Sequence, residues 1–515
     1  MDETTPPPWD HCGLGAHERD PVGCRGIRAG SRPRCLAHLT GDGRREWLAL
    51  LGPGADVDLR GTPVSGELLA ELCSRLRPGD GAAPRFGSAD FSGARFEEAG
   101  APLSFRQAVF EGPVRFVDAS FRAGREVFLD RARFEAEVWL DNARVEGVLR
   151  LRHAVFAAPV FLGPLVCSDT VDLTGAVFEG AARFRIAAPL VRCVNARFDG
   201  PASFQLRYAR LALEGAHLQQ PSTVMTSHHF AAPPEHVPAR QRPVTVSVMS
   251  LREVDASMLL LSDVDLSGCL FAGTHHLDQL RLEGRWDMSA APSGVRWHRG
   301  VPYWCTKRYV IEEERRWRAI RRRPASRHNW GDAPARDHDA PGLAALTTTY
   351  RQLRKAREDA KDEPGAADFY YGEMEMRRYS RGWRHAERWL LTLYWAASGY
   401  GLRASRALAW LAASMLATVL LMMAVGLPDT PARPYPAGSG LTGKQPPGLH
   451  RPLPERFTAE RAGKAVDVVL NSVVFRSSGP RLTRAGGYLE KAARLVEPTL
   501  LGLAVLAVRS RLKRG

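Results

Sequence analysis

Residues 129–184, LDRARFEAEVWLDNARVEGVLRLRHAVFAAPVFLGPLVCSDTVDLTGAVFEGAARF, carry the pattern that decides the fold. From Leu129, alternating steps of five and six residues reach only apolar side chains. They are Leu129, Phe134, Leu140, Val145, Leu151, Phe156, Leu162, Cys167, Leu173, Phe178 and Phe184. The residue two places before each of these is small or aliphatic, as at Ala132 and Ala154. Because this period matches neither an α-helix nor a plain β-strand, the chain must turn a corner about every fifth residue.

The pattern continues toward the C-terminus after an interruption. A second block steps by five through Leu251, Ala256, Leu261, Leu266 and Phe271. Residues 221–243, between the blocks, are rich in Pro and His and predict an insertion loop. A single coil cannot bury its apolar side alone, so we expect successive coils to stack and to pair backbone to backbone, as strands do in a sheet.

Five short segments carry a resemblance to a known family. They are Ala89-Asp-Phe91-Ser-Gly-Ala94-Arg-Phe96, Ala119-Ser-Phe121, Ala132-Arg-Phe134, Ala176-Val-Phe178-Glu-Gly and Val264-Asp-Leu266-Ser-Gly. With them, residues 85–290 resemble the pentapeptide-repeat family. The resemblance implies a mainly β fold, a right-handed quadrilateral β-helix with four pentapeptides in each coil. The steps of six depart from strict five-residue spacing, so we expect one corner of the coil to be looser or bulged.

The charge of the repeat region bears on its partners. Some members of this family resemble duplex DNA and bind topoisomerases, which requires an acidic surface. Residues 86–218 contain 16 acidic residues and 16 Arg, so their charges balance. This balance predicts neither DNA mimicry nor nucleic-acid binding. A solenoid is more often a scaffold or a docking surface, and we expect an unidentified protein partner on it.

Residues 1–84 are predicted to form an N-terminal cap region with a cluster of metal-binding residue types. Cys12, Cys24, Cys35 and His38 lie close together, and Cys35 and His38 have a C-x2-H spacing. Three thiolates and one imidazole suit a tetrahedral zinc ion, and His11 and His17 are spare candidates. The sequence therefore predicts a structural zinc site, with unligated thiols packed in a small cap as the alternative. Eight Cys in 515 residues are too few for a disulfide scaffold.

The positive charge of the chain is concentrated in its second part. The net charge is +15, from 71 basic and 56 acidic residues, and residues 301–515 contain 37 of the basic and 20 of the acidic residues. Residues 301–385 predict a basic helical linker in which Glu312 pairs with Arg316 and Glu314 with Arg318. Helical patterns over 343–361 and 366–379 predict a helix hairpin at its end. The preference for Arg over Lys, together with abundant Ala and Gly, indicates a GC-rich bacterial genome.

Residues 386–515 are predicted to form a membrane module. Residues 407–427 contain no charge and are long enough to cross a bilayer, and residues 488–508 predict a second span. Basic clusters flank the outer ends of this pair, which places the repeat domain in the cytoplasm and residues 428–485 outside. The basic flanks can also bind anionic lipid head groups. We therefore expect the protein in the cell membrane.

Other motifs are weaker. Two spans around the apolar stretch Ala465–Phe475 have the outline of a two-helix cation pore, but its filter would be the degenerate Arg476-Ser-Ser-Gly-Pro-Arg481. The segment Gly438-Ser-Gly-Leu-Thr-Gly-Lys444 resembles a phosphate-binding loop, but Gln445 replaces the required Ser or Thr. His228-His229 and His275-His276 lack the spacing of a zinc protease.

These observations lead to one function and two alternatives. The sequence predicts a membrane-anchored, non-enzymatic repeat scaffold on the cytoplasmic face, without a catalytic site or an organic cofactor. One alternative is a channel-like or sensor protein whose degenerate pore is regulated by the repeat domain. The other is a soluble interaction protein that buries residues 407–427 in a partner. The sequence leaves a homo-oligomer open in each case.

Overall fold

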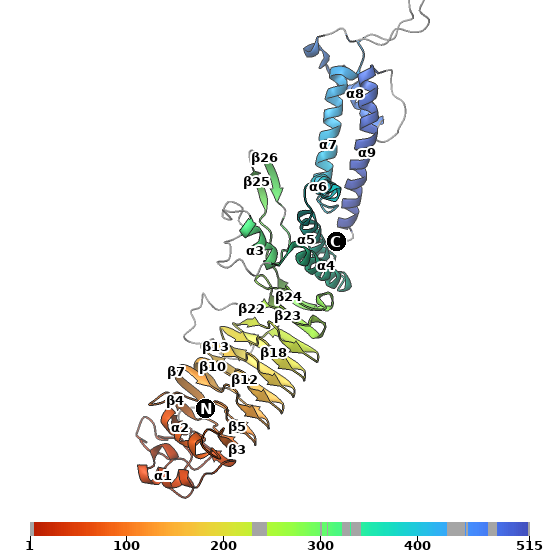
Figure 1. Ribbon diagram of the computed structural model, residues 1–515. Coiled ribbons are helices and arrows are strands. Elements are labelled where there is room, and N and C mark those ends of the chain that lie inside the picture. The colour runs from red at the N-terminus through yellow and green to blue at the C-terminus, as the bar shows by residue number, and fades with distance from the viewer. Residues whose placement is uncertain are drawn as a thin grey trace, which may run out of the picture. The chain divides into compact units, whose positions relative to one another are not determined.

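The structure is a computed structural model. It describes residues 5–228, 245–298, 301–305, 307–321, 330, 341–429, 449, 452–471 and 482–512. The chain divides into two units, Met1–Lys361 and Asp362–Gly515 (Figure 1).

The first unit contains a parallel β-solenoid of about eight turns, built from a 24-stranded sheet (Figure 1). Its strands in the first half are β1 (Ala55–Asp58), β2 (Pro63–Ser65), β3 (Arg85–Asp90), β4 (Arg95–Glu97), β5 (Val109–Phe110), β6 (Val114–Arg115), β7 (Ser120–Phe128), β8 (Arg133–Phe134), β9 (Val138–Trp139), β10 (Arg144–Arg150), β11 (Val155–Phe156) and β12 (Val160–Cys167). In the second half they are β13 (Thr170–Asp172), β14 (Val177–Phe178), β15 (Ala182–Ala187), β16 (Leu190–Arg192), β17 (Arg197–Phe198), β18 (Ala202–Arg207), β19 (Arg210–Ala212), β20 (His217–Leu218), β21 (Ser222–Thr226), β22 (Val246–Ser250), β23 (Leu259–Asp265) and β24 (Arg281–Asp287).

The strand register explains the alternation of five and six. In the column β8, β11, β14, β17 and β20, the paired residues are Arg133, Val155, Val177, Arg197 and His217. Successive partners are first 22 and then 20 residues apart. A coil of 22 residues accommodates two steps of five and two of six, whereas a coil of 20 accommodates four steps of five. The coil shortens after residue 177, which is why the alternation slips there.

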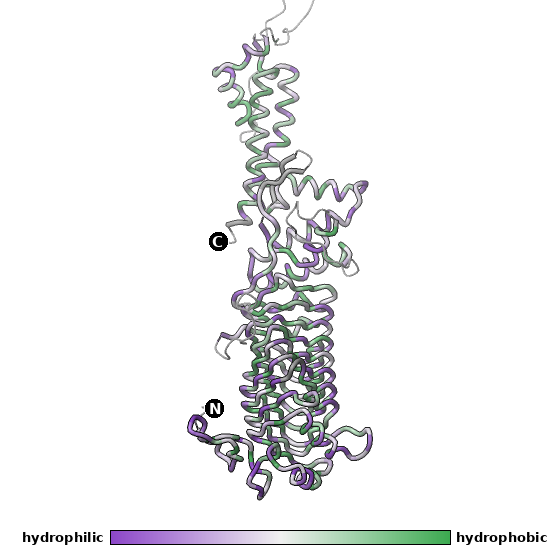
Figure 2. Tube along the Cα trace, turned by 90° about the vertical axis from the view of Figure 1, so that its left-hand side faces the viewer, coloured by the Kyte–Doolittle hydropathy of each residue, from purple (hydrophilic) through white to green (hydrophobic). Residues whose placement is uncertain are grey.

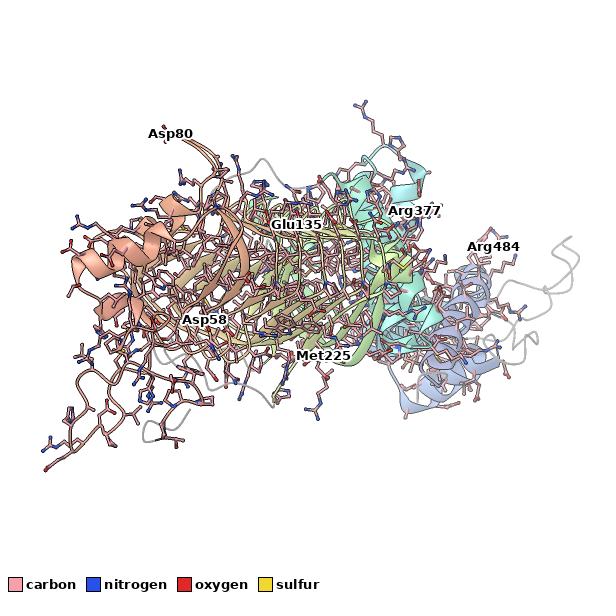
Figure 3. The ribbon with its side chains drawn as sticks, turned by 90° about the horizontal axis from the view of Figure 1, so that it is seen from below. Asp58, Asp80, Glu135, Met225, Arg377 and Arg484 are labelled. Atoms are coloured by element: carbon pink, nitrogen blue, oxygen red, sulfur yellow. The ribbon has the colours of Figure 1, made fainter. Side chains whose placement is uncertain are left out.

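The predicted inward ladder is confirmed. All eleven positions of the ladder from Leu129 to Phe184, and the small residues two places before them, are buried. In one column the rings of Phe86, Phe110, Phe134, Phe156, Phe178 and Phe198 stack on one another, with centroids 4.7–5.0 Å apart. Cys167, Cys193 and Cys269 are also buried, as expected for small core residues. Outward residues such as Glu135 project around the solenoid (Figure 3).

One corner of the coil repeats a left-handed residue. Gln107, Arg131, His153, Gly175, Asn195 and Gly215 follow one another in this column, with φ between 53° and 66°. Gly and Asn adopt this conformation at little cost, whereas the side chains of Gln107, Arg131 and His153 are strained in it. The third to the fifth of these residues therefore make the corner more cheaply than the first three.

The solenoid begins earlier than the repeat pattern indicated. β1 pairs with β3 and β2 pairs with β4, so the parallel pairing already starts at Ala55, inside the predicted cap region. The rest of the cap contains η1 (Leu36–His38), α1 (Gly41–Ala49) and α2 (Gly66–Arg75). Helix α2 interrupts the first coil and buries Leu68, Leu69 and Leu72. Irregular spacing around this helix hides the first coil from a search for a period.

The predicted insertion is displaced. Residues Ser222–Thr226 form β21 and pair with β18 and β23, so the first part of the predicted loop is a strand. The partner of Ser222 in the next coil is Leu259, 37 residues later instead of 20. Residues 229–244 of the predicted loop lie outside the described residues.

The first unit ends in short helices and a hairpin. These elements are η3 (Ala256–Met258), η4 (Leu277–Gln279), the antiparallel hairpin of β25 (Gly294–His298) and β26 (Val301–Cys305), α3 (Glu312–Arg321) and α4 (Leu343–Asp359). The hairpin was not expected from the sequence. In α3 the predicted ion pairs are confirmed, with Glu312 3.0 Å from Arg316 and Glu314 2.6 Å from Arg318.

The described part of the second unit is helical. It contains α5 (Glu363–Ser380), α6 (Ala386–Ser398), α7 (Ala404–Leu421), the π-helical turn η6 (Met422–Gly426), η7 (Leu453–Arg456), α8 (Ala459–Leu470) and α9 (Arg484–Leu512). The long helices α7 and α9 pack along each other (Figure 1). Both predicted helices of the hairpin exist, but α4 belongs to the first unit and α5 to the second.

One helix in the described part of the chain, Ala404–Gly426, is long and apolar enough to cross a membrane (Figure 2). It contains the predicted span 407–427 apart from the last residue. The predicted second span, 488–508, lies within α9, which is helical there but less apolar.

Candidate metal centre

The four predicted ligands come together at the start of the first unit. Cys12 is held by a backbone hydrogen bond from its amide to Gly26 O, and the Cys24 amide donates to Leu14 O. Cys35 is the residue before η1, and His38 is the last residue of that turn. The two loops and the short turn therefore direct three sulfur atoms and one imidazole toward one point.

The distances between these atoms fit a tetrahedral metal ion. Cys24 Sγ lies 3.8 Å from Cys35 Sγ, and His38 Nδ1 lies 3.5 Å from Cys12 Sγ and 3.4 Å from Cys35 Sγ. All four ligand atoms lie within 4.8 Å of one another. Zinc bonds of about 2.3 Å to sulfur and about 2.0 Å to nitrogen give tetrahedral edges of about 3.8 Å and about 3.5 Å. The group can therefore hold a metal ion without moving.

The surroundings favour thiolates. The amide of Gly26 donates to the sulfur of Cys24, and the amide of His38 donates to the sulfur of Cys35. A hydrogen bond from the Cys35 thiol lowers the pKa of Cys24 to about 5, against the opposing effect of burial. The same hydrogen bond, together with burial, raises the pKa of Cys35. Two sulfurs therefore share a proton that a bound cation would displace.

Gly26 is a functional position that the spacing of the ligands did not identify. A Cβ atom on Gly26 would lie 2.8 Å from Cys35 Cβ and 3.0 Å from Cys35 Sγ. Only glycine lets the backbone approach a ligand this closely. The spare candidate His17 is used elsewhere, because its Nδ1 accepts from the amides of Arg19 and Asp20.

Three comparisons were made with this geometry in view. No known protein family, curated protein or solved structure matches the chain. The function has to be argued from the residues of the chain itself.

The outer surface of the solenoid has one basic pocket. It has a volume of about 480 Å³ and is lined by Arg106, Gln107, Asp130, Arg131, Arg150, Arg152 and His153. Gln107, Arg131 and His153 are the three strained corner residues described above. Arg106 and Arg150 lie 3.4 Å from Asp130, while Arg152 pairs with the buried Asp172 at 2.7 Å. We call these seven residues the arginine pocket.

The second unit has a buried polar cluster between α5 and α6. Arg378 pairs with Glu375 at 2.8 Å and stacks on the ring of Trp395. Tyr400 donates to Glu375, and Trp395 donates to Tyr371. The cluster attaches α6 to α5, and α6 leaves Trp389, Leu390 and Leu393 exposed. Aromatic and aliphatic side chains exposed beside arginines are typical of a membrane interface.

Several weaker predictions can now be located. The pore-filter segment 476–481 and the phosphate-loop-like segment 438–444 lie outside the described residues. His276 pairs with Asp255 at 3.0 Å. Helix α8 lies within the predicted external loop 428–485, and its Ala465 and Val468 pack against Met422, Met423 and Leu427.

Proposed function

We propose that the chain is a membrane-anchored, non-enzymatic scaffold of the pentapeptide-repeat type. The observation that carries the proposal is the continuous ladder of buried side chains, which makes a rigid solenoid whose outward residues are free to vary. Coils of 20 and 22 residues with a left-handed residue at one corner support the right-handed quadrilateral form of this family.

The N-terminal cluster serves the scaffold as a structural zinc site. Zinc is supported by the three sulfurs, the one imidazole and the tetrahedral distances between them. A structural site uses all four positions for protein ligands, so no position is left for a substrate. The ion would fix the loops that cover the open end of the first coil.

The second unit anchors the scaffold to the cell membrane. Residues 407–427 provide the first span, and residues 488–508 in α9 provide the second, packed along α7. Arg403 and Arg406 precede the first span and a basic stretch follows the second, so the positive-inside rule places the solenoid in the cytoplasm. These arginines and the exposed Trp389 of α6 would contact lipid head groups.

The arginine pocket is the part of the solenoid surface that we expect a partner to occupy. Proximity labelling from the solenoid in intact cells tests this, with Arg131→Glu/Arg152→Glu as the variant and Arg197→Glu as the control. Arg197 is equally exposed but lies outside the pocket, where it pairs with Asp199 at 2.7 Å. Loss of the same labelled proteins in the pocket variant alone is the expected result. Identical labelling in all three proteins would contradict a docking role of the pocket.

A second function is favoured by one observation. A short helix, α8, lies between α7 and α9 in the sequence and packs on the end of α7, as a pore helix does in a two-helix channel. A channel-like or sensor protein regulated by the solenoid is therefore the alternative. Planar-bilayer recording from the purified protein separates the two, because reproducible unitary currents favour the channel and their absence favours the anchor.

A further inference from the structure

Helix α9 buries one carboxyl group against α7. Glu497 has no exposed surface, although it lies in the middle of the most apolar part of α9. Its neighbours Leu495 and Val496 are exposed, whereas Ala493, Ala504 and Ala507 are buried. The small residues let the two helices approach, and Glu497 lies on the buried side.

Hydrogen-bond accounting indicates the state of this carboxyl. Thr418 Oγ1 lies 2.8 Å from Glu497 Oε1 and 3.0 Å from the carbonyl oxygen of Ser414. Thr418 has one hydroxyl hydrogen, and a carbonyl can only accept. An ionised Glu497 would compete with Ser414 for that hydrogen. A protonated Glu497 donates to Thr418, and Thr418 then donates to Ser414, so both contacts are satisfied.

No cation compensates a negative charge at this position. Among the described residues Glu497 forms no ion pair, and its Oε2 has no hydrogen-bond partner. On α9 itself, Arg494 pairs with Glu490 at 2.6 Å. α7 carries its charges, Arg403 and Arg406, only at its first end.

The other elements packed on α9 supply no partner either. On α8, Arg461 pairs with Asp429 and Lys464 pairs with Glu460. Glu460 and Asp467 are the acidic residues of α8. On α6, Glu387 pairs with Arg377 and Arg381, and Arg388 donates to the carbonyl oxygen of Arg381. The turn η6 has no charged side chain. An unpaired carboxylate in this position would be strongly unfavourable in lipid.

We propose that Glu497 is a proton-binding site between α7 and α9, occupied near neutral pH. Glu497 takes its proton from water and gives it back when the site deprotonates. The neutral form holds α9 to α7 through Thr418, and the ionised form loosens the pair. This inference rests on the proposed membrane anchor, because lipid around the helices makes the unpaired charge costly.

The test uses a reagent that reacts with protonated carboxyl groups in apolar surroundings. The full chain in its native membranes is treated with dicyclohexylcarbodiimide, and the adduct is located by mass spectrometry. The O–H of the acid adds across one C=N bond to give an O-acylisourea, which rearranges to a stable N-acylurea. We expect an adduct at Glu497 that declines as the pH is raised.

Two variants make the test specific. Glu497→Gln should abolish the adduct, whereas Glu490→Gln should retain it, because Glu490 is ionised and paired with Arg494. Infrared spectroscopy gives a second reading that does not require the reagent to reach the site. The C=O stretch of a protonated carboxylic acid should be present in the wild-type protein and absent in Glu497→Gln.

An unmodified Glu497 together with identical infrared spectra of the wild-type protein and Glu497→Gln would overturn the proposal. Carbonate extraction of the same membranes tests the anchor separately. Protein that is extracted by carbonate but still shows the acid band refutes the membrane anchor and leaves the proton site standing.

Discussion

Phe156 and Phe178 stack with ring centroids 4.8 Å apart and planes 2° from parallel. The separation is the spacing between neighbouring strands, so each ring occupies one coil and covers the ring of the next. The backbones of the same two residues pair in β11 and β14. A single substitution in this column therefore affects three coils at once.

The first prediction concerns the centre of this stack. Phe156→Asp should unfold the solenoid or make it aggregate, because a buried unpaired charge costs several kcal/mol, and loss of the ring adds about 3–5 kcal/mol. Thermal unfolding followed by circular dichroism measures the effect. Phe156→Leu is the matched control, since Leu218 already follows Phe198 in the same column. Unchanged melting of a soluble Phe156→Asp protein would refute the inward ladder.

The ladder could be predicted from the sequence because its cause is local and repeated. Each coil needs a large and a small residue at the same inward positions, so the pattern at Phe134 recurs at Phe156 and Phe178. The change of coil length could be seen only as a slip of the register. The first coil could not be found this way, because α2 separates β2 from β3 and breaks the spacing.

The second prediction concerns metal. The purified protein should contain stoichiometric zinc by elemental mass spectrometry, and Cys35→Ser should lose it. Removal by a chelator should expose residues 5–60 to limited proteolysis while the stacked coils remain folded, because the ladder does not depend on the cluster. A fully folded, metal-free N-terminal region would favour the alternative of unligated thiols.

Gly26→Ala tests the geometry of the same site without removing a ligand. The added methyl group would lie 2.8 Å from Cys35 Cβ, so the loop must move away from the ligands. We expect weaker zinc binding in competition with a chromophoric chelator. Gly30→Ala provides the comparison: its position has open space around the added atom, and only a left-handed φ of 62° to strain it.

The third prediction concerns pH and Glu314. Burial would raise the pKa of Glu314, but Arg308, Arg318 and the Tyr350 hydroxyl outweigh it and lower the pKa from 4.5 to about 2. A lowered folded-state pKa stabilises the protein above pH 4.5, and this contribution is lost as the pH falls toward about 2. Glu314→Gln leaves two buried arginines without their carboxylate and should cost about 3–5 kcal/mol near neutral pH.

Its neighbour Glu313 is the matched control. Glu313 Oε1 accepts from the amides of Phe271 and Ala272 at the last coils of the solenoid, and burial raises its pKa. Gln keeps this acceptor, so Glu313→Gln should cost less than about 1 kcal/mol. A raised pKa gives stability that is lost as the pH rises, so only Glu314→Gln should flatten the acid limb of a urea-unfolding series. Equal effects of both substitutions would contradict these assignments.

The two glutamates also show where sequence reasoning stops. The pairs of Glu312 with Arg316 and Glu314 with Arg318 follow from helical spacing, and both exist. The contacts of Glu313 with Phe271 and of Glu314 with Tyr350 join residues 42 and 36 positions apart, which no local pattern encodes. Glu497 and Thr418, 79 positions apart, are a further case. In the metal site the ligand types could be predicted, but the close approach of Gly26 could not.

The last prediction tests the membrane anchor. Leu416 is in the middle of α7 and 60 % exposed, so it faces lipid if the helix crosses a bilayer. Leu416→Arg should release the protein from carbonate-washed membranes or cause its degradation, because Arg near the centre of a span costs about 2.5–3.5 kcal/mol. Leu453→Arg is the control, since Leu453 is 57 % exposed but lies in η7, outside the span. If carbonate removes the wild-type protein as well, α7 is covered by a protein partner, and the soluble alternative is correct.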